Sequence, residues 1–228
     1  MKDFLKTVAG IVLFFAVAIG VLTFMRNIIR QPSVVLTETE CDPPCWYKIK
    51  PGRTNPAQVY ATLGRLEIVN QETIMGDYAK YDILKNIFWY FQYPAVDSAG
   101  SIYFDDDRVT AISFLTIDSL KLADLFEKFG QPEKYWAEIG YGENREYLDV
   151  TLFFPTQWLV ANVLIDIAYG ANQVEIKSTT PVFRVTYIDP EMLPELLETR
   201  LLVDTPFNAR TGSFQTWSGF GTILFERK

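Results

Sequence analysis

The sequence predicts an α+β fold class, in which an N-terminal transmembrane helix is followed by a tandem repeat of helix plus antiparallel sheet. Three observations support this prediction. Residues 8–25 are apolar and carry no charge, as in a helix that spans a bilayer. Two amphipathic segments, 55–63 and 120–129, are each followed by a glycine, as helices commonly are. Runs of β-branched and aromatic residues bounded by turn residues follow each segment, as expected of antiparallel strands.

The composition excludes several classes of function. The 228 residues include no histidine, which removes Ser-His-Asp triads, Cys-His dyads and histidine zinc sites. The net charge is −7, and a nucleic-acid-binding surface needs the opposite sign, so no nucleic-acid partner is predicted. The glycine pairs of 140–142 and 219–221 are too short for phosphate loops and indicate turns. We therefore predict no cofactor and no metal.

Residues 1–30 are predicted to form an uncleaved signal anchor. The 18 residues of the apolar run span about 27 Å of helix, and Phe4 and Leu5 extend it toward the ~30 Å hydrocarbon core. A buried core helix is one alternative, but it would show a polar face. A cleavable signal peptide is the other, and it would have a shorter apolar run before a small-residue cleavage site. The membrane is thus a predicted partner through residues 4–30.

Residues 31–45 are predicted to be a linker that holds the only two cysteines, Cys41 and Cys45. Two prolines between them bend the chain, so that a disulfide can close the loop. Two free thiols are the alternative, whereas zinc would lack further ligands and a redox motif would have two intervening residues. A structural disulfide implies an oxidising compartment. We therefore expect a single-pass protein of the plasma (inner) membrane, with a cytoplasmic N-terminus and an extracytoplasmic domain.

The rest of the chain is predicted to contain two α+β repeats, 46–117 and 118–188. When Gly64 is aligned with Gly130, the apolar positions of the two preceding helices coincide. The predicted N-caps of these helices are Thr54 and Ser119, because short hydroxyl side chains cap helix N-termini well.

The second part of each repeat supports the same duplication. Aligning Phe104 with Phe154 superposes two predicted hairpins, with an insertion in the first repeat near 67–86. Residues 189–228 are predicted to add a C-terminal helix and a closing strand.

Short motifs in the first repeat resemble a known family. Gly52-Arg53-Thr54, Val59 and Leu63-Gly64 are similar to the G-x-T-x-x-x-x-V-x-x-x-L-G opening of the SmpA/OmlA family of outer-membrane assembly lipoproteins. Trp89-Tyr90 and the segment from Ile102-Tyr103-Phe104 to Val109 resemble the W-x-Y and F-x-D/N-G-x-V elements of that family.

The resemblance covers roughly residues 46–167, and the β-lactamase inhibitor protein has a related fold in two tandem copies. It implies helices on one face of an antiparallel sheet, with the other face free to meet a partner. The chain departs from the family pattern because it has no lipid-bearing cysteine and its second repeat lacks the G-x-T motif.

Acidic residues supply candidate sites of low specificity. Asp105-Asp106-Asp107 lacks the alternating ligands and glycine of a calcium loop, so a solvated turn is the simpler interpretation. Asp149 and Asp166 could act as general acid and base in a glycosidase, but strand acids that face solvent are more common. We predict no catalytic residue.

Aromatic residues are the stronger functional signal, at 15% of the chain. Neighbouring residues of a strand point to opposite faces, so some aromatic side chains lie on the face away from the helices unless both faces are covered. Trp and Tyr are enriched at interfaces. The residues of the predicted partner face are Trp89, Tyr90, Trp136 and Trp158.

These observations predict a membrane-anchored, extracytoplasmic binding or scaffold protein of the cell envelope, with an unidentified envelope protein as partner. Two alternatives belong to other classes. One is a carboxylate-based envelope hydrolase, and the other is a receptor for a small apolar or glycan ligand.

Overall fold

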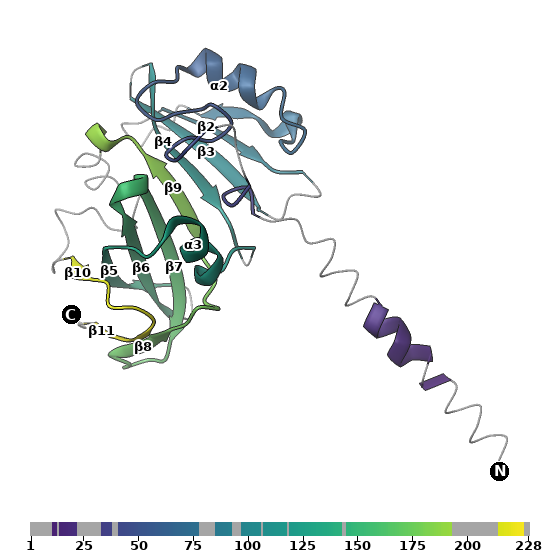
Figure 1. Ribbon diagram of the computed structural model, residues 1–228, viewed down its shortest axis with the longest axis vertical. Helices are drawn as coiled ribbons and strands as arrows, with labels where there is room; N and C mark the ends of the chain where they lie inside the picture. The colour runs from purple at the N-terminus through teal and green to yellow at the C-terminus, as the bar shows by residue number, and fades with distance from the viewer. Residues whose placement is uncertain are drawn as a thin grey trace, which may run out of the picture. The chain divides into compact units, whose positions relative to one another are not determined.

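The computed structural model separates the chain into two compact units, Met1–Gln31 and Pro32–Lys228, and each is described by itself (Figure 1). The described residues are 11–12, 14–21, 33–37, 41–77, 85–92, 97–105, 107–117, 119–142, 145–192 and 214–225.

The predicted N-terminal transmembrane helix is wrong. Within the described residues, no helix combines the length and the apolarity that a bilayer crossing requires. The helical residues described in the first unit are 11–12 and 14–21, and the rest of the predicted anchor lies outside the described residues. Apolar composition indicates how favourably a segment would transfer into lipid, and it does not by itself establish a spanning helix.

Antiparallel sheet is the main regular structure of the second unit. Nine described strands form one sheet in the order β1-β2-β3-β4-β9-β7-β6-β5-β10, and β8 pairs with β11 in a separate two-stranded sheet. The strands of the large sheet are Met75–Asp77 (β1), Lys85–Tyr90 (β2), Ala99–Asp105 (β3), Arg108–Leu115 (β4), Lys134–Tyr141 (β5), Glu146–Phe154 (β6), Leu159–Ile167 (β7), Arg184–Ile188 (β9) and Gln215–Thr216 (β10). The small sheet contains Gln173–Ile176 (β8) and Gly221–Leu224 (β11).

Strand β9 joins two meanders at the centre of the large sheet. It pairs with β4 on one side and with β7 on the other, and Tyr187 lies opposite Ile112 and Leu159 in these two pairings. The meanders are β2-β3-β4 and β7-β6-β5, and each follows a helix in the chain. Pro32–Lys228 forms one compact unit, so the division into repeats at 117/118 stays a prediction.

The two helices, Pro56–Leu63 (α2) and Leu122–Phe129 (α3), lie inside the predicted segments, but their caps differ from the prediction. Asn55 caps α2 in a capping box, in which its side chain accepts from the Gln58 amide at 2.9 Å and the Gln58 side chain accepts from the Asn55 amide at 3.0 Å. The Thr54 hydroxyl instead accepts from the Lys50 amide at 2.8 Å. The Ser119 hydroxyl likewise does not cap α3, because it donates to the Asp97 carboxylate.

Helix α3 packs on the sheet face that carries Tyr187 and Phe154. Phe129 contacts the Tyr187 ring edge-to-face at 6.4 Å, and Phe126 contacts Phe154 at 6.0 Å. Figure 1 shows α3 lying over the region of β7 and β9. The apolar stripe of α3 and the alternate residues of these strands thus form one core.

The C-terminal segment is described in part. Pro190–Met192 (η3) forms a 3-10 turn, and the remainder of the predicted helix near 191–202 lies outside the described residues. Strand β11 runs antiparallel to β8, with Ile223 opposite Val174. The last described strand therefore completes the small sheet.

Candidate ligand-binding site

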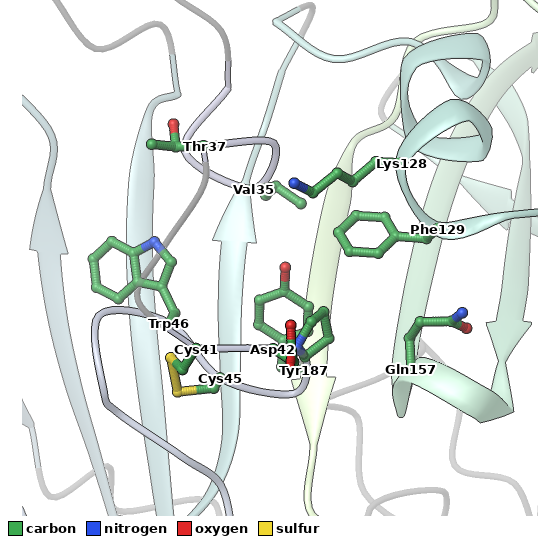
Figure 2. Close-up of a pocket in the computed structure, with 11 residues that line it drawn as sticks. Val35, Thr37, Cys41, Asp42, Cys45, Trp46, Lys128, Phe129, Gln157 and Tyr187 are labelled. Carbon is green, nitrogen blue, oxygen red and sulfur yellow. A yellow bond between two sulfur atoms is a disulfide. The ribbon is translucent and has the colours of Figure 1, made fainter.

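A cavity of about 360 Å³ lies between the disulfide loop, the end of α3 and the centre of the large sheet (Figure 2). Its volume is in the range of clefts that hold small organic ligands. The lining residues come from five places in the chain: Val35, Thr37, Cys41, Asp42, Pro43, Cys45, Trp46, Lys128, Phe129, Gln157 and Tyr187.

The disulfide loop forms one wall, and the predicted bond between Cys41 and Cys45 is confirmed. The Lys48 amide donates to the Cys41 sulfur at 3.4 Å. Directly after the loop, Trp46 and Ile49 exchange backbone hydrogen bonds of 2.9 and 2.8 Å, which close a tight turn. The covalent bond and this turn together fix the loop against the domain.

Trp46 anchors the disulfide loop in the core. Its side chain is 1% exposed, stacks on Trp89 with ring centroids 5.8 Å apart, and contacts Phe114 at 5.1 Å. The indole Nε1 is buried and has no hydrogen-bond partner among the described residues. A buried N–H donor without a partner is costly, and because this nitrogen is itself covered by its neighbours, it stays an unsatisfied donor in the core.

Tyr187, near the end of β9, forms the floor of the cavity. Its ring is 3% exposed and lies between Phe114 and Phe129, with centroid distances of 6.1 and 6.4 Å. The hydroxyl makes no hydrogen bond to another described residue. Burial raises the pKa of Tyr187 well above its ordinary value near 10, so the hydroxyl keeps its proton at neutral pH and remains a donor.

The wall opposite the disulfide loop comes from α3 and from a short 3-10 turn, Pro155–Gln157 (η2). Lys128 and Phe129 are the last two residues of α3, and Figure 2 shows the Lys128 ammonium reaching into the space above the Tyr187 hydroxyl. Gln157 is half-buried and makes no hydrogen bond to another described residue. The left-handed backbone of Trp158 ends η2 and returns the chain to the sheet, which leaves Gln157 at the cavity.

A buried carboxylate holds the remaining wall, the turn that includes Val35 and Thr37. Asp97 is 4% exposed and accepts hydrogen bonds from the Val34 amide and the hydroxyls of Ser33 and Ser119, at 2.5, 3.0 and 2.5 Å. These bonds tie the N-terminal turn of the second unit to the loops before β3 and α3. Asp97 therefore positions the cavity wall without lining the cavity.

The structure does not gather the four residues of the predicted partner face. Trp89 and Trp136 are 0% and 4% exposed, so neither is available to a partner as the prediction requires. Trp158 is half-buried, and Tyr90 alone is clearly exposed, at 49%. Strand alternation does separate Trp89 from Tyr90, but the structure places Trp89 on the helix-covered face, where it stacks on Trp46.

The candidate acids are also apart from the cavity. Asp149 is buried and accepts from the Asn162 side chain at 3.3 Å, whereas Asp166 is exposed and pairs with Arg145 at 3.2 Å. Asp105 and Arg108 face each other across the β3–β4 turn, and Asp106 lies outside the described residues. Among the described side chains, no cluster of His, Cys, Asp and Glu is suited to a metal ion.

Sequence reasoning missed most of the cavity. Lys128 and Gln157 look like ordinary surface residues, and Tyr187 lies in an apolar run that reads as a core strand. No local pattern connects them, because the contact between the disulfide loop and α3 is a tertiary feature. The cysteine pair was the one lining element that the sequence singled out.

In comparisons with known proteins, no protein-family model, no curated protein and no solved structure matches the chain. The resemblance to the SmpA/OmlA family therefore stays a prediction.

Proposed function

We propose that this chain is an extracytoplasmic binding protein that takes a small ligand into the cavity between the disulfide loop and α3. The observation that carries the proposal is the Tyr187 hydroxyl, which lies at this cavity without a hydrogen bond to another described residue, with the Lys128 ammonium reaching into the same space. Native proteins satisfy the great majority of their buried polar groups, so such donors favour an incoming acceptor.

The composition of the cavity wall supports binding more than catalysis. The titratable side chains of the wall are Asp42, Lys128 and Tyr187. Because burial raises the pKa of Tyr187, its hydroxyl is a poor general base near neutral pH. The disulfide in the wall supports an oxidising compartment, as in the extracytoplasmic prediction.

Ligand-observed NMR with a library of small aromatic and aliphatic fragments tests the proposal on the full chain with its disulfide intact. In the variant Gln157→Trp, a large side chain at the half-buried position fills the cavity. Gln173→Trp adds the same side chain at an exposed position of β8, away from the cavity. We expect fragments to bind the wild type and Gln173→Trp and to lose binding in Gln157→Trp. The proposal fails if no fragment binds, or if every hit survives in Gln157→Trp.

A second candidate function is a protein-binding scaffold, as the sequence predicts. It is favoured by the edge of the sheet formed by β1 and β2, where Phe88 and Tyr90 contact each other edge-to-face at 4.9 Å. Met75 lies opposite Phe88 in the neighbouring strand and is 54% exposed. Crosslinking from a photoreactive residue at Tyr90, with Tyr169 on the exposed turn after β7 as control position, tests it. A partner that crosslinks equally from both positions would contradict this candidate.

A further inference from the structure

The polar side chains of the cavity wall can hold a hydrogen-bond acceptor. The Lys128 ammonium can only donate hydrogen bonds, and the Asp42 carboxylate can only accept them. The Tyr187 hydroxyl and the Gln157 carboxamide can do both, and neither has a partner among the described residues. A ligand that matches this wall carries a strong acceptor.

The charge of the cavity wall indicates which acceptor group the ligand carries. Lys128 has no carboxylate partner within the described part of the chain, so its ammonium is available to an anionic ligand. Figure 2 shows this ammonium and the Tyr187 hydroxyl directed toward the same part of the cavity, beside Val35 and Phe129. A cation and a hydroxyl that converge in this way suit a carboxylate, which accepts charge-assisted hydrogen bonds at both oxygens.

Asp42 and the apolar wall define the rest of the ligand. Asp42 lies on the disulfide loop and is exposed. Its carboxylate repels negative charge, so it disfavours a ligand with a second negative group. The other walls are formed by Phe129, Val35, Pro43 and the disulfide itself, none of which offers a charged partner. A ligand that fits these walls therefore has an apolar body and a single charged group at one end.

On the basis of the proposed binding function, we infer that the cavity binds a small monocarboxylate with an apolar body. Lys128 and Tyr187 bind the carboxylate, and the Gln157 carboxamide donates to a further acceptor atom of the ligand. The face of Phe129 and the disulfide loop enclose the apolar body. The carboxylate belongs either to a free organic acid or to the C-terminus of a short peptide, because both present the same group.

Three probes with one body separate the contributions: 3-phenylpropionate, its neutral amide 3-phenylpropionamide and the cation 3-phenylpropylamine. Their dissociation constants are measured by NMR titration with the disulfide-intact full chain at pH 7. We expect the carboxylate to bind about ten-fold more tightly than the amide, and the amine to bind most weakly, because a charge-assisted pair is stronger than a neutral hydrogen bond. The tripeptide Ala-Ala-Phe and its C-terminal amide show whether a peptide carboxylate is accepted as well.

Variants identify the groups that recognise the carboxylate. Lys128→Met removes the charge and keeps an apolar stem, and it is expected to weaken 3-phenylpropionate about ten-fold while leaving the amide unchanged. Tyr187→Phe removes one hydroxyl and is expected to weaken the carboxylate several-fold. Lys134→Met on β5 is the matched control, because Lys134 is exposed and does not line the cavity.

The outcomes separate this inference from the proposed function. If the amide binds as tightly as the carboxylate, or if Lys128→Met leaves the preference intact, the carboxylate assignment is wrong while the binding function stands. If no probe binds and the fragment library also gives no hit that Gln157→Trp removes, both fail. Loss of the carboxylate preference in Lys128→Met with unchanged behaviour of Lys134→Met supports the inference.

Discussion

The carboxylate of Asp97 accepts a hydrogen bond from the backbone amide of Val34, a residue 63 positions earlier in the chain. Hydroxyls from Ser33 and Ser119 donate to the same carboxylate, so one buried acid holds two distant segments. The turn that follows Val34 contributes Val35 and Thr37 to the cavity wall. The geometry of the candidate site thus depends on a residue that does not line it.

Replacing Asp97 by alanine is expected to destabilise the second unit. The substitution leaves the buried donors of Val34 and Ser33 without their acceptor, whereas the Ser119 hydroxyl can still donate to the Thr116 carbonyl, and such losses cost about 1–3 kcal/mol of unfolding free energy. Urea unfolding followed by tryptophan fluorescence measures the change. Asp107→Ala, at an exposed turn position, is the control and should stay within about 0.5 kcal/mol of wild type. Equal stability of the two variants would contradict the assigned role.

The Asp97 carboxyl group also predicts the sign of a pH dependence in the free energy of unfolding. Burial raises the pKa of Asp97 above its ordinary value of 3.8, and the hydrogen bonds from Ser119, Val34 and Ser33 offset part of this effect. The folded state therefore binds the proton more tightly than the unfolded state does. This contribution to stability is fully present below the unfolded pKa and is lost as the pH rises through the folded pKa.

Asp97→Asn removes this titration while it keeps a similar shape. We expect the stability of wild type relative to Asp97→Asn to fall as the pH rises from about 3.8 through the raised pKa of Asp97, and then to level off. Unfolding free energies of both proteins, measured at half-unit intervals of pH, test the sign. A relative stability that increases with pH in this window would show that the pKa of Asp97 is lowered by folding.

The disulfide was predictable from the sequence, whereas the cavity beside it was not. Two cysteines with two prolines between them limit the local chain to few arrangements, so local reasoning was sufficient. Lys128 and Tyr187 meet the loop only because β9 runs between β4 and β7, and no short-range pattern encodes that pairing. The periodicity of a sequence does not indicate which distant residues the strand order brings together.

Helix caps and strand faces show the same limit on a smaller scale. Thr54 and Ser119 have the side chains that cap helices, but each finds another partner, the Lys50 amide and the Asp97 carboxylate. The alternation in β2 correctly separates Trp89 from Tyr90, but it cannot say which of the two faces the helices cover. Tertiary contacts decide both questions.

Removal of the disulfide by Cys41→Ser with Cys45→Ser is expected to lower stability by about 2 kcal/mol. The bond closes a loop with a sequence separation of 4, and short loops lose little chain entropy in the unfolded state. Unfolding of the double variant, compared with wild type in the presence and absence of reductant, measures the effect. Ligand affinity at the cavity should fall as well, because the loop is one of its walls. Unchanged affinity and stability would show that the turn after Trp46 suffices to hold the loop.

A close contact between Gly100 and Trp89 gives the most local test of the core. A Cβ atom at Gly100 would lie 2.1 Å from the Trp89 Cζ2 atom and 2.4 Å from Cε2. The indole cannot move aside easily, because it is 0% exposed and stacks on Trp46. Gly100→Ala is therefore expected to destabilise the protein by about 1–3 kcal/mol, as overpacked cores do.

The rescue variant separates this steric clash from the loss of glycine itself. In the Trp89→Phe background the ring is smaller, so Gly100→Ala should cost less there than in the wild type, and the difference is the coupling energy between the two positions. Gly142→Ala is the control, because its nearest contact would be the flexible Arg145 side chain at 3.3 Å. Strictly additive effects of Gly100→Ala and Trp89→Phe would mean that the indole does not lie over Gly100. Since Trp89 supports Trp46, a real clash should also weaken ligand binding at the cavity.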